Sequence, residues 1–171
     1  MQLEPLYRVA FTTPEAWSVE LEGEHGTEGR SFLLAEGRSE GLGERKGAAS
    51  LLPSFRSQPL RLRRCWDSAR LRGANFPRRR ADGTLTPDFR GVLETDDGAT
   101  VLYSWRGYGR AGRDGARELV GSVTHETGDS RYRWLNTAVC ALSGEVRPRQ
   151  DGAGFDVVYE VAEILWERPS C

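Results

Sequence analysis

Thr86–Gly109, with the sequence TPDFRGVLETDDGATVLYSWRGYG, contains the clearest structural signal in the chain. Two runs rich in β-branched and aromatic residues flank the tripeptide DDG at residues 96–98, a composition typical of a tight hairpin turn. Side chains alternate between the two faces of a strand, so Val101, Tyr103 and Trp105 share one face of the second run. The stretch therefore predicts an antiparallel hairpin, one face of which could line a cavity.

Outward from this hairpin, short apolar runs separated by turn residues predict further strands. Before the hairpin these runs are residues 3–13, 17–22 and 30–36, and after it they are residues 118–125, 134–142 and 154–166. Residues 38–71 are weakly patterned, with a glycine-rich first part and an arginine-rich second part, so we expect an irregular insertion there. The pattern indicates an all-β protein in which residues 1–171 form a single domain.

The last run, FDVVYEVAEILW at residues 155–166, has apolar residues on both of its faces. A strand of this kind has to be covered on both sides, either in a barrel wall with another layer outside it or at an oligomer interface. This pattern favours a homodimer.

The composition is that of an ordinary globular domain, with 171 residues, 38% hydrophobic and 29% charged. No apolar run is long enough to cross a bilayer, and the start MQLEPLYR has no hydrophobic leader, so we expect a cytoplasmic protein with no membrane partner. Three scattered cysteines and two distant histidines lack metal-ligand spacing, and there is no P-loop or dinucleotide-binding turn. We therefore expect neither a metal ion nor a cofactor.

Charge is unevenly distributed along the chain. Residues 56–80 contain nine arginines against a single acidic residue, Asp67, which gives this stretch a local charge of +8. Such a stripe can bind phosphate or nucleic acid, but it lacks regularly interleaved aromatic residues. We favour a solvated loop, and keep an anion-binding or nucleic-acid-binding module as the weakest of three functional hypotheses.

Thr124–Asn136, THETGDSRYRWLN, is the densest group of titratable, aromatic and amide side chains. Side chains of these types close together are what a small-molecule site needs. A purely structural interpretation stands beside this one, in which GDS is a turn and Tyr132 and Trp134 cap a core.

Four segments of the chain resemble domain-of-unknown-function family 3237, also grouped as uncharacterised protein family 0311. They are LEPLYRV, then RRRADGT with the strand FRGVLETDDGATVLY, then ETGDSRYRWLN, and finally FDVVYEV. The resemblance implies a single closed antiparallel β-barrel of about eight strands, similar to allene oxide cyclase and other calycin-like barrels. Residues 38–71 depart from the family pattern, because they are longer than its usual link between strands.

A barrel of about eight strands has room for at most one small ligand, so its mouth is the expected site. Without a cofactor, the available side chains support proton transfer. Our leading hypothesis, which rests on analogy with similar barrels, is a cofactor-independent cyclase or isomerase acting on a small, conjugated, oxygenated metabolite of specialised metabolism. The alternative is a non-catalytic barrel that binds or carries a small molecule.

The expected catalytic residues are His125 and Glu94 as general acid or base and Arg90 as the group that stabilises an enolate or carboxylate. The expected substrate-binding residues are Tyr103, Trp105, Arg106, Tyr108, Tyr132, Trp134 and Asn136. Each has a structural alternative: His125 as a surface residue at a strand end, Glu94 and Arg90 as a cross-strand charge pair, and the tryptophans as core.

Overall fold

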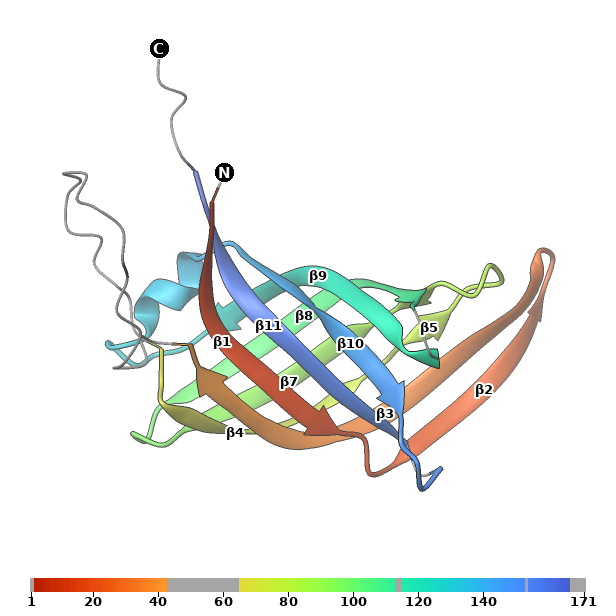
Figure 1. Cartoon of the computed structure of the whole chain (residues 1–171), viewed down its shortest axis with the longest axis horizontal. Helices are drawn as coiled ribbons and strands as arrows, with labels where there is room; N and C mark the ends of the chain where they lie inside the picture. Colours follow the sequence, from red (N-terminus) through yellow and green to blue (C-terminus); the bar gives the residue numbers. More distant parts are fainter. Residues whose placement is uncertain (1, 43–64, 113–114, 153, 167–171) are drawn as a thin grey trace, which may run out of the picture.

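The computed structural model describes residues 2–42, 65–112, 115–152 and 154–166, which form a β-barrel with a projecting hairpin (Figure 1). The strands are β1 (Gln2–Thr12), β2 (Ala16–Gly23), β3 (Gly26–Gly41), β4 (Ser68–Asn75), β5 (Arg78–Arg79), β6 (Leu85–Thr86), β7 (Asp88–Thr95), β8 (Thr100–Ala111), β9 (Arg117–Glu126), β10 (Cys140–Pro148) and β11 (Phe155–Leu165). A short 3-10 helix, η2, spans Arg133–Thr137. The described ranges contain no α-helix, and none of their helices is long and apolar enough to span a membrane.

Eight of these strands close into a barrel in the order β1, β11, β10, β9, β8, β7, β4, β3 and back to β1. Every neighbouring pair in this ring is antiparallel. The hairpin predicted over residues 86–109 is β7 and β8, in which Leu93 pairs with Val101 and Phe89 with Trp105. The expected closed antiparallel barrel of about eight strands is therefore confirmed.

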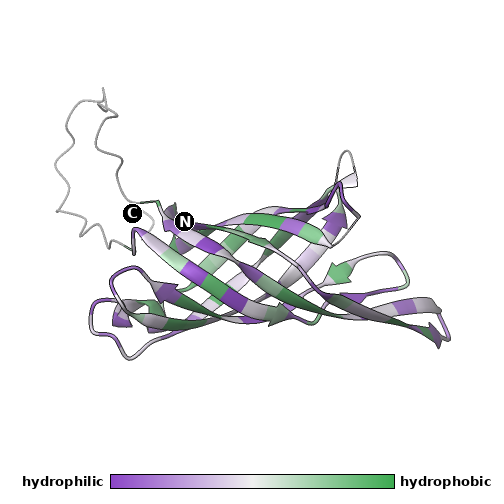
Figure 2. Cartoon of the chain, turned by 90° about the horizontal axis from the view of Figure 1, so that it is seen from below, coloured by the Kyte–Doolittle hydropathy of each residue, from purple (hydrophilic) through white to green (hydrophobic). Residues whose placement is uncertain are grey.

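Alternation of side chains along each strand separates the barrel interior from solvent, as the alternating colours of many strands in Figure 2 show. In β1, for example, Tyr7, Val9 and Phe11 are buried while Arg8 and Ala10 are exposed. Inward aromatic side chains need space in so narrow a barrel, and glycines on neighbouring strands provide it. A Cβ atom at Gly73 would lie 2.6 Å from the carbonyl oxygen of Arg90 and 2.7 Å from the Phe89 ring.

The β2–β3 hairpin extends beyond the barrel, at the right of Figure 1. Residues 33–41 of β3 belong to the barrel wall, where they pair with β1 and β4, whereas residues 26–33 pair with β2. The short strands β5 and β6 connect this hairpin to the far end of β8. We call residues 16–33 the arm.

Three predictions of secondary structure need correction, two of strands and one of the irregular insertion. Residues 134–139 are not a strand, because hydrogen bonds from Leu135 N to Tyr132 O and from Ala138 N to Leu135 O turn the chain into η2. The irregular insertion predicted over 38–71 is wrong at both ends, since β3 continues to Gly41 and β4 begins at Ser68; its middle, residues 43–64, lies outside the described residues. The strand predicted over 30–36 is far longer, because pairing with β2 extends β3 back to Gly26.

The last strand, β11, is a barrel strand with buried Val157, Tyr159 and Val161 facing inward. On its outer face Val158, Ala162 and Ile164 are only half-buried in the single chain. A homodimer through this face stays a prediction.

Substituting Gly73 with alanine tests the glycine packing. We expect Gly73→Ala to lower the free energy of unfolding by about 3 kcal/mol, because backbone atoms of β7 leave no room for the added methyl group. Urea unfolding measures the loss. Gly128→Ala is the control, since a Cβ there meets no atom within 4 Å, and its effect should stay within about 0.5 kcal/mol. Equal losses in the two variants would contradict this account.

Candidate functional site

The barrel wall divides the predicted site residues into an inner and an outer group. His125, Tyr103 and Trp105 point into the barrel and are buried. The outer group lies on the solvent-facing side of β7 and β8 and consists of Arg90, Glu94, Arg106 and Tyr108. The three predicted catalytic residues are therefore not brought together, because His125 is inside the barrel while Glu94 and Arg90 are outside it.

The outer residues are engaged in exposed ion pairs. Glu94 accepts a hydrogen bond from Arg72 at 2.9 Å, so a Glu94–Arg90 pair is not what forms. Arg106 binds Asp88 at 2.9 Å, and Arg90 lies 3.9 Å from the same carboxylate. Exposed pairs of this kind contribute little to stability.

His125 forms the centre of the inner group. It lies on β9, is only 3% exposed, and its Nε2 atom is 2.6 Å from the hydroxyl of Tyr7 on β1. Its Nδ1 atom is buried and has no hydrogen-bond partner among the residues that the structure describes. An unpaired buried polar atom costs about 1–3 kcal/mol, so its presence marks a candidate for function.

Burial keeps both members of this pair uncharged. It lowers the pKa of His125 to about 4 and raises the pKa of Tyr7 well above its usual value. The two side chains are thus a neutral imidazole and a protonated phenol at physiological pH. In one imidazole tautomer Nδ1 is a base and in the other it is a donor, so the ring can take or give a proton at that atom.

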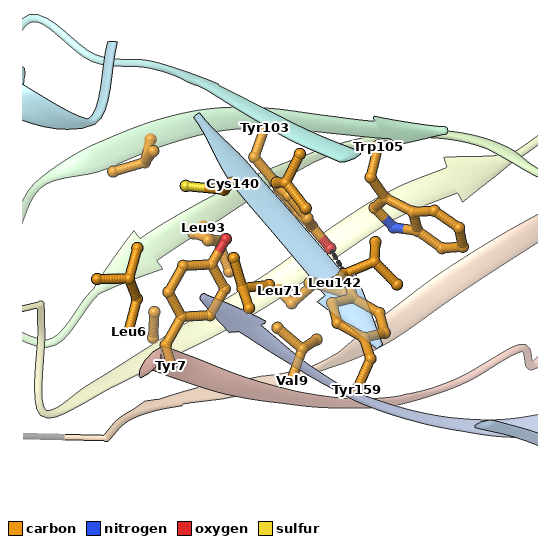
Figure 3. Packing of buried hydrophobic residues seen from close by; sticks show 14 of the residues in the cluster. Leu6, Tyr7, Val9, Leu71, Leu93, Tyr103, Trp105, Cys140, Leu142 and Tyr159 are labelled. Atoms are coloured by element: carbon orange, nitrogen blue, oxygen red, sulfur yellow. Dashed lines mark hydrogen bonds between the residues drawn. The ribbon is translucent and has the colours of Figure 1, made fainter. Parts of the chain in front are cut away.

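A second polar pair lies nearby in the barrel interior. The hydroxyls of Tyr103 on β8 and Tyr159 on β11 are 2.6 Å apart (Figure 3). Burial raises the pKa of both phenols, so both keep their protons. One proton occupies the hydrogen bond between them, which leaves the other hydroxyl proton as a donor for a further oxygen atom. The indole ring of Trp105 lies 5.6 Å from the Tyr159 ring, and its buried Nε1 atom has no partner in the described part of the chain.

Aromatic rings shield His125 from solvent at its end of the barrel. The ring of Trp66 lies 5.0 Å from Tyr7, and Tyr132 packs against Trp66 at 5.7 Å. The indole nitrogen of Trp66 donates to the hydroxyl of Ser39 at 3.0 Å. Any ligand that reaches His125 from this end has to displace these rings.

Residues 124–136, which we singled out in the sequence, hold this end of the barrel closed. The Tyr132 hydroxyl donates to Asp97 at 2.6 Å, Arg131 forms an ion pair with Asp97 at 2.9 Å, and the Thr95 hydroxyl donates to the same carboxylate. Hydrogen bonds from Thr95 and Tyr132 lower the pKa of Asp97. The TDDGA and RYRWLN segments, the most specific parts of the family resemblance, are thus bound to each other.

The remaining predicted residues of this segment have structural roles too. The Asn136 amide accepts a hydrogen bond from Thr127 N at 2.9 Å and donates to Thr127 O at 3.0 Å. Trp134 packs partly buried against the core from η2. Because η2 is not a strand, Tyr132, Trp134 and Asn136 do not line one wall of the barrel, and the structural interpretation of this segment fits best.

A hollow of about 630 Å³ lies on the outer face of β7, β8 and β9. Its polar lining includes Arg90, Arg106, Ser104 and Thr124, and the last two are joined by a hydroxyl hydrogen bond of 2.9 Å. It therefore brings together the outer candidates Arg90 and Arg106, but neither His125 nor Glu94.

No three side chains of His, Cys, Asp or Glu gather as metal ligands in the described ranges. Cys65 and Cys140 are buried free thiols. Burial raises their pKa values to about 12 and about 11, so neither is a thiolate nucleophile. The described arginines of the basic stripe include Arg72, Arg78 and Arg79, each of which is paired with a glutamate.

Tyr7 and Tyr159 were not among the site residues predicted from the sequence. Each alternates with valine along its strand and therefore looks like an ordinary core residue. The signal that could have found them is the resemblance itself, because Tyr7 lies in LEPLYRV and Tyr159 in FDVVYEV.

The closed barrel, with two polar pairs in an otherwise apolar interior, places this chain among small antiparallel β-barrel proteins. It matches over 95% of its length a β-barrel-like protein from Acinetobacter baumannii, with 20% identity, 94% of that chain covered and a TM-score of 0.65. A protein of unknown function from Clostridium acetobutylicum shares 14% identity over 96% of this chain and 100% of its own, with a TM-score of 0.68. A Penicillium herquei protein described as an enzyme shares 18% identity over 94% of this chain and 93% of its own, with a TM-score of 0.50. At these identities the matches establish the fold alone.

The chain belongs to the family of proteins of unknown function DUF3237, which matches residues 1–164. No curated protein sequence matches it. The family resemblance inferred from the sequence motifs is thus confirmed.

Removing the Tyr132 hydroxyl tests the contact between the two motif segments. We expect Tyr132→Phe to lower the free energy of unfolding by about 1 kcal/mol, because it deletes a hydrogen bond to the Asp97 carboxylate, which is partly exposed to solvent. Tyr108→Phe is the matched control, since Tyr108 is exposed on the outer face. If both variants unfold at the same urea concentration as the wild type, the contact does not stabilise the barrel.

The buried imidazole should make stability depend on pH. The pKa of His125 is about 4 in the folded chain and about 6.5 when the chain is unfolded, so between these values the unfolded chain binds more protons. Stability is therefore lost as the pH falls through this window, by about 2 kcal/mol between pH 7 and pH 5. His125→Gln should remove that part of the pH dependence. Both proteins retain His25, so any contribution of His25 is the same in the two profiles. Identical pH profiles of the two chains would show that His125 titrates normally.

Proposed function

We propose that this protein is a cofactor-independent enzyme that moves protons on a small, conjugated, oxygenated substrate, as a cyclase or an isomerase. The observation that carries the proposal is the buried His125–Tyr7 pair, in which Nδ1 of a neutral imidazole has no partner among the residues that the structure describes. The buried polar residues of the described chain include no acid, lysine or arginine that would satisfy or ionise this ring.

The arrangement suits a reaction in which a proton leaves one atom of a substrate and another atom gains one. When Tyr7 accepts from Nε2–H, the Nδ1 atom is a base that removes a proton from a hydroxyl or from carbon next to a carbonyl. The free hydroxyl proton of the Tyr103–Tyr159 pair stabilises negative charge on a carbonyl oxygen. For addition of an internal hydroxyl to a conjugated double bond, the C–O bond forms as the π bond breaks, and the hydroxyl proton goes to the imidazole. The imidazolium then gives this proton to the enolate carbon, which regenerates the neutral ring.

The aromatic side chains around His125 and the two tyrosines strengthen electrostatic interactions with a bound substrate. Aromatic rings exclude water, so charge that develops on the substrate is screened less than in solvent. A negative charge next to His125 would raise the pKa of the imidazole from about 4 towards neutrality, where a general acid or base is most effective.

A panel of conjugated ketones, with and without a pendant hydroxyl, tests the proposal in D₂O. Incorporation of deuterium at carbon, followed by NMR, reports proton transfer even where no new product accumulates. We expect His125→Gln to reduce the rate at least about 100-fold. His25→Gln is the matched control, because His25 is the only other histidine and is exposed, and it should retain the wild-type rate.

The second candidate is a non-catalytic barrel that binds or carries a small molecule. The hollow of about 630 Å³ on the outer face of β7, β8 and β9 favours it, since Arg90 and Arg106 line this hollow and His125 does not. A panel member that binds wild-type protein and His125→Gln equally, with no deuterium incorporation by either, would support carriage and contradict catalysis. Glu94→Gln in the same assay decides whether the outer carboxylate contributes.

A further inference from the structure

Strand β2 is the one strand of the described chain with a single neighbour. Every other described strand pairs on two sides, whereas β2 pairs with β3 alone. All eight of its residues are exposed. Its second edge therefore presents unpaired backbone N–H and C=O groups, which is a template for another strand.

The two faces of β2 differ in the contacts that their side chains make within the chain. The polar face is bound within the chain, because Ser18 is hydrogen-bonded to Ser31 at 2.8 Å and Glu20 accepts from Arg79 at 2.9 Å. The apolar face carries Trp17, Val19 and Leu21, which are 52%, 58% and 47% exposed. It continues onto the Phe32 ring, 5.6 Å from Trp17.

Natural edge strands are usually protected by charge, proline or a bulge. Strand β2 contains no proline or lysine, and its register with β3 is regular from Ala16 to Gly23. The charge of Glu20, at the middle of the edge, is neutralised by Arg79. The edge thus has no proline, lysine or bulge, and its second glutamate, Glu22, lies near the end of the strand, where the Thr27 hydroxyl donates to it at 3.5 Å.

We propose that β2 pairs with β2 of a second copy of this chain, antiparallel across a two-fold axis that passes through Val19. In this register Trp17 lies opposite Leu21 of the other copy and Val19 lies opposite its counterpart, so the apolar faces join. On the other face Ser18 lies opposite Glu20, and no two carboxylates oppose each other.

The sequence of the strand is what identifies a second copy as the partner. An interface on a two-fold axis has to be self-complementary, and WSVEL at residues 17–21 keeps its polar and apolar character when its order is reversed. Moving the axis to Glu20 would place Glu20 against Glu20, and like charges directly opposite each other are destabilising. Moving it to Ser18 would place apolar Leu21 opposite Glu15, which lies before the strand begins. The register centred on Val19 is therefore the favoured one.

Sedimentation velocity across a concentration series tests the dimer. We expect the wild type to be dimeric and Val19→Arg to be monomeric at the same concentration, because the variant places two guanidinium groups together on the axis. Val120→Arg is the matched control, since Val120 is 48% exposed on the outer face of β9, and it should remain dimeric. Circular dichroism checks that both variants are folded.

A cysteine on the axis tests the register. In a Cys171→Ser background, Val19→Cys should form an intermolecular disulfide on mild oxidation, because equivalent positions on the axis of paired strands lie within disulfide reach. Val120→Cys should not. The buried thiols of Cys65 and Cys140 do not compete.

A wild type that stays monomeric throughout the series would overturn the proposal, and so would a dimer that persists in Val19→Arg. A dimer that is lost instead through Ile164→Arg would assign the interface to the outer face of β11 and would also overturn it. Loss of the dimer in Val19→Arg together with cross-linking of Val19→Cys supports it.

Discussion

The whole structure depends on backbone hydrogen bonding along both edges of β1. Residues 2–12 pair with β11, and residues 7–12 also pair with β3, so this strand closes the barrel wall. Closure removes every open edge from the wall and separates an interior from water. Without it, the inward side chains of β8 and β9 would lie on an open, solvated sheet, and neither the low pKa of His125 nor the high pKa of Tyr103 would exist.

The barrel interior combines close packing of aromatic rings with hydrogen bonding of buried polar side chains. Large aromatic rings fill it, and glycines such as Gly73 give them room. Among these rings lie four polar side chains, Tyr7, His125, Tyr103 and Tyr159, which form two hydrogen-bonded pairs of 2.6 Å. An apolar core of the same volume would not contain an atom such as His125 Nδ1, which has no hydrogen-bond partner in the described ranges. The polar pairs therefore do not maximise stability, which is why the proposed function rests on them.

Local features of the sequence predicted much of the fold. The β7–β8 hairpin followed from the DDG turn and alternating side chains, whereas residues 134–139 were wrongly predicted as strand because their apolar pattern did not reveal the local hydrogen bonds of η2. The site was harder. Alternation places Tyr103 and Arg106 on opposite faces, yet which face points inward depends on closure. Tyr7 and His125 are 118 positions apart, so no local pattern could pair them.

That separation has a consequence for how the chain folds. The hydrogen bonds along one edge of β1 can form only after β11 has been synthesised, since β11 is its neighbour there. Contacts of such long range slow folding, because loop-closure entropy is lost before the contacts form. During synthesis β1 therefore emerges long before β11 does, so we expect Tyr7 and His125 to meet late, when closure places β1 in the barrel wall. Fragments of this barrel should contain hairpins but no Tyr7–His125 hydrogen bond.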